Sequence, residues 1–261
     1  MLIVNQSTRT TPARVERKIG ASRLLLMAAK LFKSLVVMVS LLATSTVAAN
    51  VGPGVKAFER GHPSSALRSW LPLARGGNPK AQNNVGLMYE RGLGVSQSYS
   101  EAMRWYSMAA DQGLPEANHN LGLLYYSGYG TDVNDREAFK RFRVAAEKEL
   151  PESLYMLGLM VYFGKATTPN PETAMQLFEA AAIKGYPEAQ YMVGYLMQSG
   201  DLGAPRPSAA FVWSKLAAER GIELAADLNY MTTLVLDEAE QAQALQLTDL
   251  CRSSNFTDCP K

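Results

Sequence analysis

Small and apolar residues recur along the chain at a constant step of 36 positions. The segments AQNNVG, ANHNLG, SLYMLG and AQYMVG begin at residues 81, 117, 153 and 189, without insertion or deletion between copies. In each copy, positions i, i+4 and i+7 are small or apolar, which is the spacing of one buried face of an α-helix. We therefore predict four consecutive units that bury the same helical face. That face comprises Ala81-Val85-Met88, Ala117-Leu121-Leu124, Ser153-Leu157-Met160 and Ala189-Val193-Leu196.

Proline and glycine mark the two ends of the first helix in each unit. Proline suits the first helical turn, because its missing N–H has no partner to lose there. Glycine ends a helix easily, because it adopts the left-handed conformation. The first unit therefore places helix A between Pro79 and Gly92, and a second helix, B, over about residues 99–112. The same columns hold Pro115, Pro151 and Pro187, and Gly128, Gly164 and Gly200.

The two helices of each unit are expected to pack closely. Helix A contains an internal glycine, Gly86 in the first unit, although glycine there costs about 1 kcal/mol relative to alanine. We expect such a cost where another backbone passes close to the helix. Helix B carries a small residue, Ala102, in its packing face. The chain is therefore predicted to be all-α and to form a right-handed α-solenoid of 36-residue helical hairpins. The equivalent residues are Gly122, Gly158 and Gly194, and Ala138, Ala174 and Ala210.

The ends of the array are predicted to differ from its centre, because the terminal units of a solenoid must cap the stack. Trp70 lies 36 positions before Tyr106, which indicates a half-copy upstream. Downstream, Tyr230 stands where the earlier units have glycine. We divide the folded region into an N-terminal half-repeat over residues 57–77, the repeat array over 78–235, and a C-terminal capping helix with a disulfide tail over 236–261.

A second face of helix A varies between the units and is the candidate binding surface. Its outer positions change from polar to aromatic along the array, so they need no common packing partner. In helical-hairpin solenoids this face lines the concave surface, and tyrosine offers contact area and a polar tip at little entropic cost. The alternative is that these tyrosines pack against one another and the next helix. The predicted partner-binding residues are Asn83, Glu90, His119, Tyr126, Tyr155, Tyr162, Tyr191 and Tyr195.

The amino-terminal region is typical of a secretory signal peptide. Residues 1–49 hold seven Lys and Arg but one acidic residue, and an apolar run over 34–43 is followed by the small residues Val47 and Ala49. This order predicts cleavage near Ala49, which leaves no stable membrane anchor. A start at Met27 would give a signal of ordinary length. The alternatives are a long basic n-region and an uncleaved anchor.

Charge and motifs argue against nucleic-acid binding and catalysis. Residues 50–261 carry 19 basic and 23 acidic residues, whereas nucleic-acid binding needs a basic surface. No G-x-S-x-G, H-E-x-x-H or P-loop motif occurs. His119 alone cannot supply the ligands of a zinc site. We predict a non-enzymatic protein without catalytic residues, metal or cofactor. Acids that follow proline at helix starts suit the helix dipole; they are Glu116, Glu152 and Glu188.

The two cysteines, Cys251 and Cys259, lie eight positions apart near the carboxyl end. In an oxidising compartment an even number of cysteines indicates a disulfide. Closing so short a loop is expected to contribute about 2–3 kcal/mol. A redox-active pair would favour C-x-x-C spacing, so we interpret the bridge as structural.

The repeat resembles the Sel-one-like repeat (SLR) family, which is related to the tetratricopeptide repeats. Its pattern of A-x-x-x-L-G-x-x-Y-x-x-G-x-G-V, then A-x-x-W-Y-x-x-A-A-x-x-G, is met almost fully by residues 81–113, and the resemblance covers residues 57–235. Glu149, Ala166 and Leu202 replace family glycines in later copies. The resemblance implies a scaffold that binds a partner protein. Together with the signal-type amino-terminal region, it leads us to predict a monomeric periplasmic protein that regulates an envelope or signalling protein.

Two further functions stay open from the sequence. Some cysteine-rich relatives are associated with penicillin binding, so the alternative function is a peptidoglycan- or β-lactam-binding protein with weak hydrolase activity. The tripeptide NFT at residues 255–257 matches a glycosylation acceptor. That match leaves a eukaryotic lumenal adaptor as a third interpretation.

Overall fold

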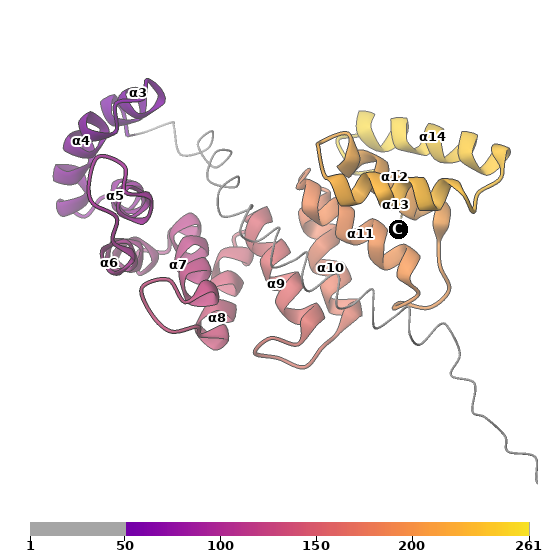
Figure 1. The fold of residues 1–261 in the computed structure, drawn as a ribbon, viewed down its shortest axis with the longest axis horizontal. Helices are drawn as coiled ribbons and strands as arrows, with labels where there is room; N and C mark the ends of the chain where they lie inside the picture. The colour runs from indigo at the N-terminus through magenta and orange to yellow at the C-terminus, as the bar shows by residue number, and fades with distance from the viewer. Residues whose placement is uncertain (1–50, 261) are drawn as a thin grey trace, which may run out of the picture.

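The computed structural model describes residues 51–260, in which all regular secondary structure is helical (Figure 1). Consecutive helices pack as hairpins that follow one another along an arc, with α3 near one end and α14 at the other. The predicted α-solenoid is confirmed, whereas the predicted signal peptide lies outside the described residues. The helices are α3 (Pro53–Glu59), α4 (Pro63–Arg75), α5 (Pro79–Arg91), α6 (Tyr99–Ala110), α7 (Pro115–Ser127), α8 (Asp135–Ala146), α9 (Pro151–Phe163), α10 (Pro171–Ala182), α11 (Pro187–Ser199), α12 (Pro207–Ala218), α13 (Glu223–Thr233) and α14 (Glu238–Ser253).

The helix ends follow from local sequence signals. Helices α5, α7, α9 and α11 each begin at proline and end before a left-handed glycine, with φ values of 66°, 70°, 69° and 78°. Three of the second helices begin at a capping residue that the repeat comparison did not use. The side chains of Ser98, Asn134 and Asn170 each accept a hydrogen bond from the backbone N–H three residues later. This bond satisfies one of the free donors at a helix start.

The predicted buried face of helix A forms the core of the array. Every residue of that face has at most 7% of its surface exposed. The facing alanines of helix B, Ala102, Ala138, Ala174 and Ala210, are completely buried. The apolar positions spaced i, i+4 and i+7 therefore pack as the sequence predicts.

The internal glycine of helix A makes room for an aromatic ring in three of the four units. A Cβ atom on Gly158 would lie 2.6 Å from a ring carbon of Phe178 on α10, which is closer than packed atoms approach. The ring therefore lies directly on the bare backbone of α9. The same contact pairs Gly86 with Tyr106 and Gly122 with Phe142.

The fourth unit differs because its second helix has Ser214 where the others have an aromatic residue. There a Cβ atom on Gly194 would lie 3.1 Å from the carbonyl oxygen of Ala210 on α12. Our expectation that another backbone passes close to the glycine is therefore correct for Gly194 and wrong for the three earlier glycines, where a side-chain ring fills the space.

The amino-terminal end of the array is a shortened hairpin formed by α3 and α4. Trp70 on α4 is 3% exposed and lies against Gly54 on α3, so this pair repeats the contact of glycine with an aromatic ring. The Phe58 ring also contacts Trp70, at a centroid distance of 5.8 Å. The half-copy recognised in the sequence thus has a short first helix as its partner.

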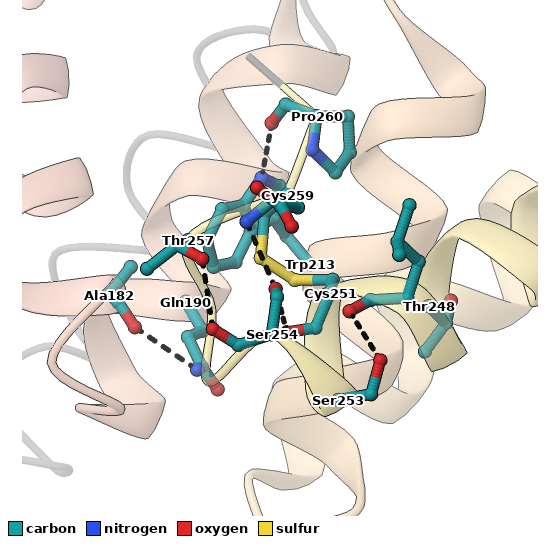
Figure 2. The surroundings of a disulfide bond; sticks show 12 residues. Ala182, Gln190, Trp213, Thr248, Cys251, Ser253, Ser254, Thr257, Cys259 and Pro260 are labelled. Atoms are coloured by element: carbon teal, nitrogen blue, oxygen red, sulfur yellow. Dashed lines mark hydrogen bonds between the residues drawn. A yellow bond between two sulfur atoms is a disulfide. The ribbon is translucent and has the colours of Figure 1, made fainter.

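The carboxyl-terminal end departs from the hairpin pattern. Helix α13 takes the place of a fifth helix A and packs on α12 and α11, whereas α14 turns back to pack on α12. The tail after α14 is held by the predicted disulfide between Cys251 and Cys259, whose Cα atoms lie 4.5 Å apart (Figure 2). The indole Nε1 of Trp213 donates a hydrogen bond of 2.8 Å to the Pro260 carbonyl and ties the tail to α12.

Candidate protein-binding face

The predicted binding residues lie along helices α5, α7, α9 and α11, at equivalent positions of successive repeats. We call this surface the helix-A face. The structure divides it into side chains buried between repeats and side chains that stay partly exposed. Its members are Asn83, Leu87, Glu90, His119, Leu123, Tyr126, Tyr155, Leu159, Tyr162, Tyr191, Tyr195 and Gln198.

Three predicted residues are buried between consecutive repeats. Asn83, His119 and Tyr155 are 5%, 6% and 9% exposed. The Nδ1 atom of His119 lies 2.8 Å from the Ser153 hydroxyl of the next repeat. We predicted these three as partner-binding residues on an open face, but the following repeat covers them. Two further contacts cover the others: Asn120 donates a hydrogen bond of 3.0 Å to Asn83, and the Tyr155 and Tyr186 rings lie 5.3 Å apart.

The tyrosines of α9 and α11 form a partly exposed group. The Tyr162 hydroxyl donates a hydrogen bond of 2.7 Å to Asp201, in the turn after α11. Tyr195 lies near Tyr162, and its ring centroid lies 6.3 Å from that of Tyr191. We call Tyr162, Tyr191 and Tyr195 the tyrosine cluster. The bond to Asp201 holds the Tyr162 ring in place, and all three side chains are partly exposed.

Glu90 and Tyr126 are engaged by other side chains of the array. The Tyr106 hydroxyl donates a hydrogen bond of 2.6 Å to Glu90. Burial raises the pKa of Glu90, and the Tyr106 bond and the nearby Arg91 only partly offset this effect. The ammonium group of Lys165 lies 4.2 Å from the Tyr126 ring centroid, a cation–π contact between repeats. Both side chains therefore help to connect the hairpins.

Acidic residues that we assigned to helix starts also belong to this region. Glu152 and Glu188 lie three residues before Tyr155 and Tyr191, so they share a helical face with them. Burial raises the pKa of both carboxyl groups, and the preceding acid of the series, Glu116 or Glu152, adds a smaller repulsion. The spacing of three residues was visible in the sequence, but their burial was not.

The chemistry of the face is that of neutral hydrogen-bonding groups. Burial raises the pKa of Tyr191 to about 12, with smaller contributions from Tyr195 and Asp227. Burial lowers the pKa of His119 to about 4, so its imidazole is neutral near pH 7. Within residues 51–260, no three His, Cys, Asp or Glu side chains gather in a metal-binding group. Within the same range, no helix has the length and apolar character needed to cross a membrane.

Stacked hairpins with one constant, buried face and one variable face define the class of α-solenoid repeat proteins. Within that class, four consecutive segments match the Sel1 repeat family, over residues 79–114, 115–149, 151–186 and 187–222. The chain therefore belongs to the Sel1 repeat family, as its resemblance to SLR proteins indicated. Sel1 repeats form a fold that mediates protein–protein interaction and is generally non-catalytic.

Two solved structures show the same architecture. The crystal structure of a Sel1 repeat protein from Oxalobacter formigenes is 28% identical, with a TM-score of 0.61, and the match covers 78% of this chain and 88% of that one. The crystal structure of c5321, a protective antigen of uropathogenic Escherichia coli strains with an SLR fold, is 26% identical, with a TM-score of 0.57. That match covers 70% of this chain and 44% of the antigen. A comparison with curated proteins finds no match.

Proposed function

We propose that this protein is a non-enzymatic periplasmic scaffold that holds a segment of a partner protein on the concave, helix-A face of its array. The observation that carries the proposal is the tyrosine cluster, which presents partly exposed rings on a fold that mediates protein–protein interaction. The periplasmic location rests on the signal-type features of residues 1–49. The partner is an envelope or signalling protein whose activity the scaffold regulates.

The tyrosine cluster suits recognition because its geometry exists before binding. The bond from Tyr162 to Asp201 fixes one ring, and the Tyr191 and Tyr195 rings pack with their centroids 6.3 Å apart. A partner that packs on fixed rings loses less conformational entropy than one that must order them. Tyrosine also places an apolar ring beside a hydroxyl group, so it contacts both side chains and backbone of a bound segment.

Site-specific photocrosslinking tests this proposal directly. A photoreactive benzophenone side chain at position 195 should give a discrete covalent adduct with one protein in intact cells, because this position lies within the proposed contact. The adduct should disappear when Tyr191→Ala is added, which removes a neighbouring ring of the same cluster. The same photoreactive side chain at position 245 on α14, where Leu245 is 44% exposed, is the control and should give no such adduct.

Three results would contradict the proposal: equal adducts at positions 195 and 245, no adduct at position 195, or an adduct that Tyr191→Ala leaves unchanged. A thermal unfolding curve of each variant shows that the array remains folded. Saturable labelling by a fluorescent β-lactam would instead favour the alternative of a cell-wall or β-lactam-binding protein.

A further inference from the structure

A large apolar surface is exposed at the carboxyl end of α13. Tyr230, Met231, Leu234 and Val235 are 63%, 57%, 62% and 59% exposed. Tyr230 and Met231 lie in the last turn of α13, and Leu234 and Val235 lie in the turn that directly follows Thr233, so we treat these four side chains as one patch. We call it the α13 patch. Contiguous exposed apolar residues are uncommon on a monomer and mark interaction sites.

The α13 patch continues the helix-A face into a unit that has no successor. Met231 lies 36 positions after Tyr195, and Leu234 lies 36 positions after Gln198. In the preceding units, part of this face is covered by the next repeat, as the contact of Tyr155 with Tyr186 shows. Helix α14 does not provide this cover, because it packs on α12. The patch therefore extends the partly exposed positions of the helix-A face, those of Tyr195 and Gln198, to the last unit of the array.

Tyr230 changes which side chains can pack against the carboxyl end of α13. Its equivalents in the four preceding units are glycines, three of which receive an aromatic ring from helix B. A tyrosine at this position leaves no space for an aromatic ring of a second helix, and its own side chain is exposed to solvent instead. The α13 patch therefore does not repeat the hairpin contact of the array. It presents its own large side chains for insertion into the surface of another helix.

The charged residues of the segment that carries the patch are all acidic. Residues 221–250 contain six Asp and Glu and no Lys, Arg or His. All six acidic residues are exposed, and Asp227 lies on the same side of α13 as Met231. Among the ion pairs of residues 51–260, none uses an acid between positions 221 and 248. Five of the six acids, all except Asp249, therefore form no ion pair within residues 51–260, and Asp227 lies beside the patch.

We propose that the α13 patch binds an amphipathic helix of a partner protein, whose apolar side covers Tyr230, Met231 and Leu234 and whose flanking Lys and Arg residues face the acids. An amphipathic helix lays its apolar side on such a surface, with anchors spaced three and four residues apart. Basic flanks match the charge of residues 221–250. This site lies beyond the tyrosine cluster and does not depend on it.

The same charges disfavour two other occupants. In a symmetric dimer the patch would meet its own copy, which would bring the acids beside it, Asp227 among them, towards the same acids of the other chain. An anionic membrane surface would repel the same residues, because such surfaces attract basic segments. The partner helix therefore combines apolar anchors with positive charge.

The test measures binding of a model helix to the purified full chain. The probe is a fluorescent 18-residue peptide, about five helical turns, with leucines on one face and lysines on the other; the control peptide has glutamates in place of lysines. We expect saturable binding of the lysine peptide, weakened at least about tenfold by Met231→Ser with Leu234→Ser. Added salt should weaken binding further, because it screens the charges.

Matched variants separate this site from the others. Leu245→Ser with Leu250→Ser removes two exposed leucines from α14 and should change affinity less than about twofold, as expected for residues outside a contact. Tyr191→Ala with Tyr195→Ala should also leave binding unchanged. The proposal is wrong if no peptide binds, if the glutamate peptide binds equally, or if the patch variant binds normally. Loss of binding only in the Tyr191 and Tyr195 variant would place the peptide on the tyrosine cluster and overturn the inference while supporting the proposed function.

Sedimentation velocity of the same full chain tests whether a second copy of the chain covers the α13 patch. We expect a monomer at all concentrations used for binding. A concentration-dependent dimer that Met231→Ser with Leu234→Ser dissociates would show that a second copy covers the patch, and it would overturn the proposal.

Discussion

At the scale of single residues, the position of a side chain in the array determines its burial and therefore its pKa. His119, Tyr155 and Tyr191 occupy the same column, but the first two are buried by the next repeat and the third is partly exposed. Burial disfavours the charged form of a side chain, so it lowers the pKa of histidine and raises that of tyrosine. The result for His119 is a neutral imidazole that bonds to Ser153 across the repeat boundary.

The buried imidazole of His119 predicts a specific loss of stability in acid. Its pKa is about 4 in the folded chain against 6.5 for an unperturbed histidine. Between these values only the unfolded chain binds the proton, so stability falls as the pH falls through this window and is unaffected above it. The full difference corresponds to about 3 kcal/mol. Urea unfolding of the native chain and of His119→Gln, from about pH 7 to about pH 4, measures it.

The comparison of the two chains isolates the histidine. The raised pKa values of Glu152 and Glu188 act in the opposite direction, because these carboxyl groups take up protons more readily in the folded chain. Both chains share that effect, so it cancels in the difference. We expect the stability advantage of the native chain over His119→Gln to shrink as the pH falls. If the stability of the native chain and that of His119→Gln change in parallel with pH, His119 is not buried as described.

The sequence predicted which residues share a helical face but not which of them are exposed to solvent. A column that varies from Asn83 to Tyr191 was interpreted as free of packing constraints. The structure shows that variation is also possible within a repeat interface, because each residue has its own partner: Asn120 for Asn83 and Ser153 for His119. Such pairs lie 34 to 37 positions apart and carry no mark in a single sequence.

At the scale of helices, the contact between a glycine and an aromatic ring organises each hairpin. Periodicity and the flanking Pro and Gly columns were enough to predict both helices and their ends. The size of the group facing Gly158 could not be predicted, because it depends on the packing depth of α10 against α9. In the structure the Phe178 ring occupies the space that a side chain at position 158 would need.

Replacing Gly158 with alanine is therefore expected to destabilise the protein, although alanine favours helices by about 1 kcal/mol. Forcing a methyl group into a packed core costs about 1–3 kcal/mol, so we expect a net loss of up to about 2 kcal/mol. Combining Gly158→Ala with Phe178→Leu should cost less than the sum of the two single changes, because the smaller side chain relieves the clash. Chemical denaturation of the three variants measures this coupling.

The control is Gly76→Ala, at the end of α4. Gly76 is exposed, and its φ of −75° is accessible to alanine. This change should be neutral or slightly stabilising. If Gly158→Ala behaves like Gly76→Ala, or if its effect simply adds to that of Phe178→Leu, the ring does not limit the space at this glycine.

At the scale of the whole molecule, the array is held together by neighbouring helices. Each helix packs mainly on the helices before and after it, and the buried residues fall into three separate clusters. Stability in such an array is approximately a sum over units and their interfaces. The stacking of units could be predicted from the repeat, whereas the return of α14 onto α12 could not, because it follows no column of the repeat.

Removing the disulfide tests whether stability is local in this way. Cys251→Ala with Cys259→Ala should lower stability at the carboxyl end by about 2–3 kcal/mol, the loop-closure contribution expected for this short loop. Because units depend on their neighbours, hydrogen exchange should accelerate in α12, α13 and α14 and stay unchanged in α5 and α6. Reducing agent should reproduce the effect in the native chain and add nothing in the variant. Faster exchange throughout residues 51–260 would show instead that the array opens as one cooperative unit, so that a partner bound at either end would stabilise the whole protein.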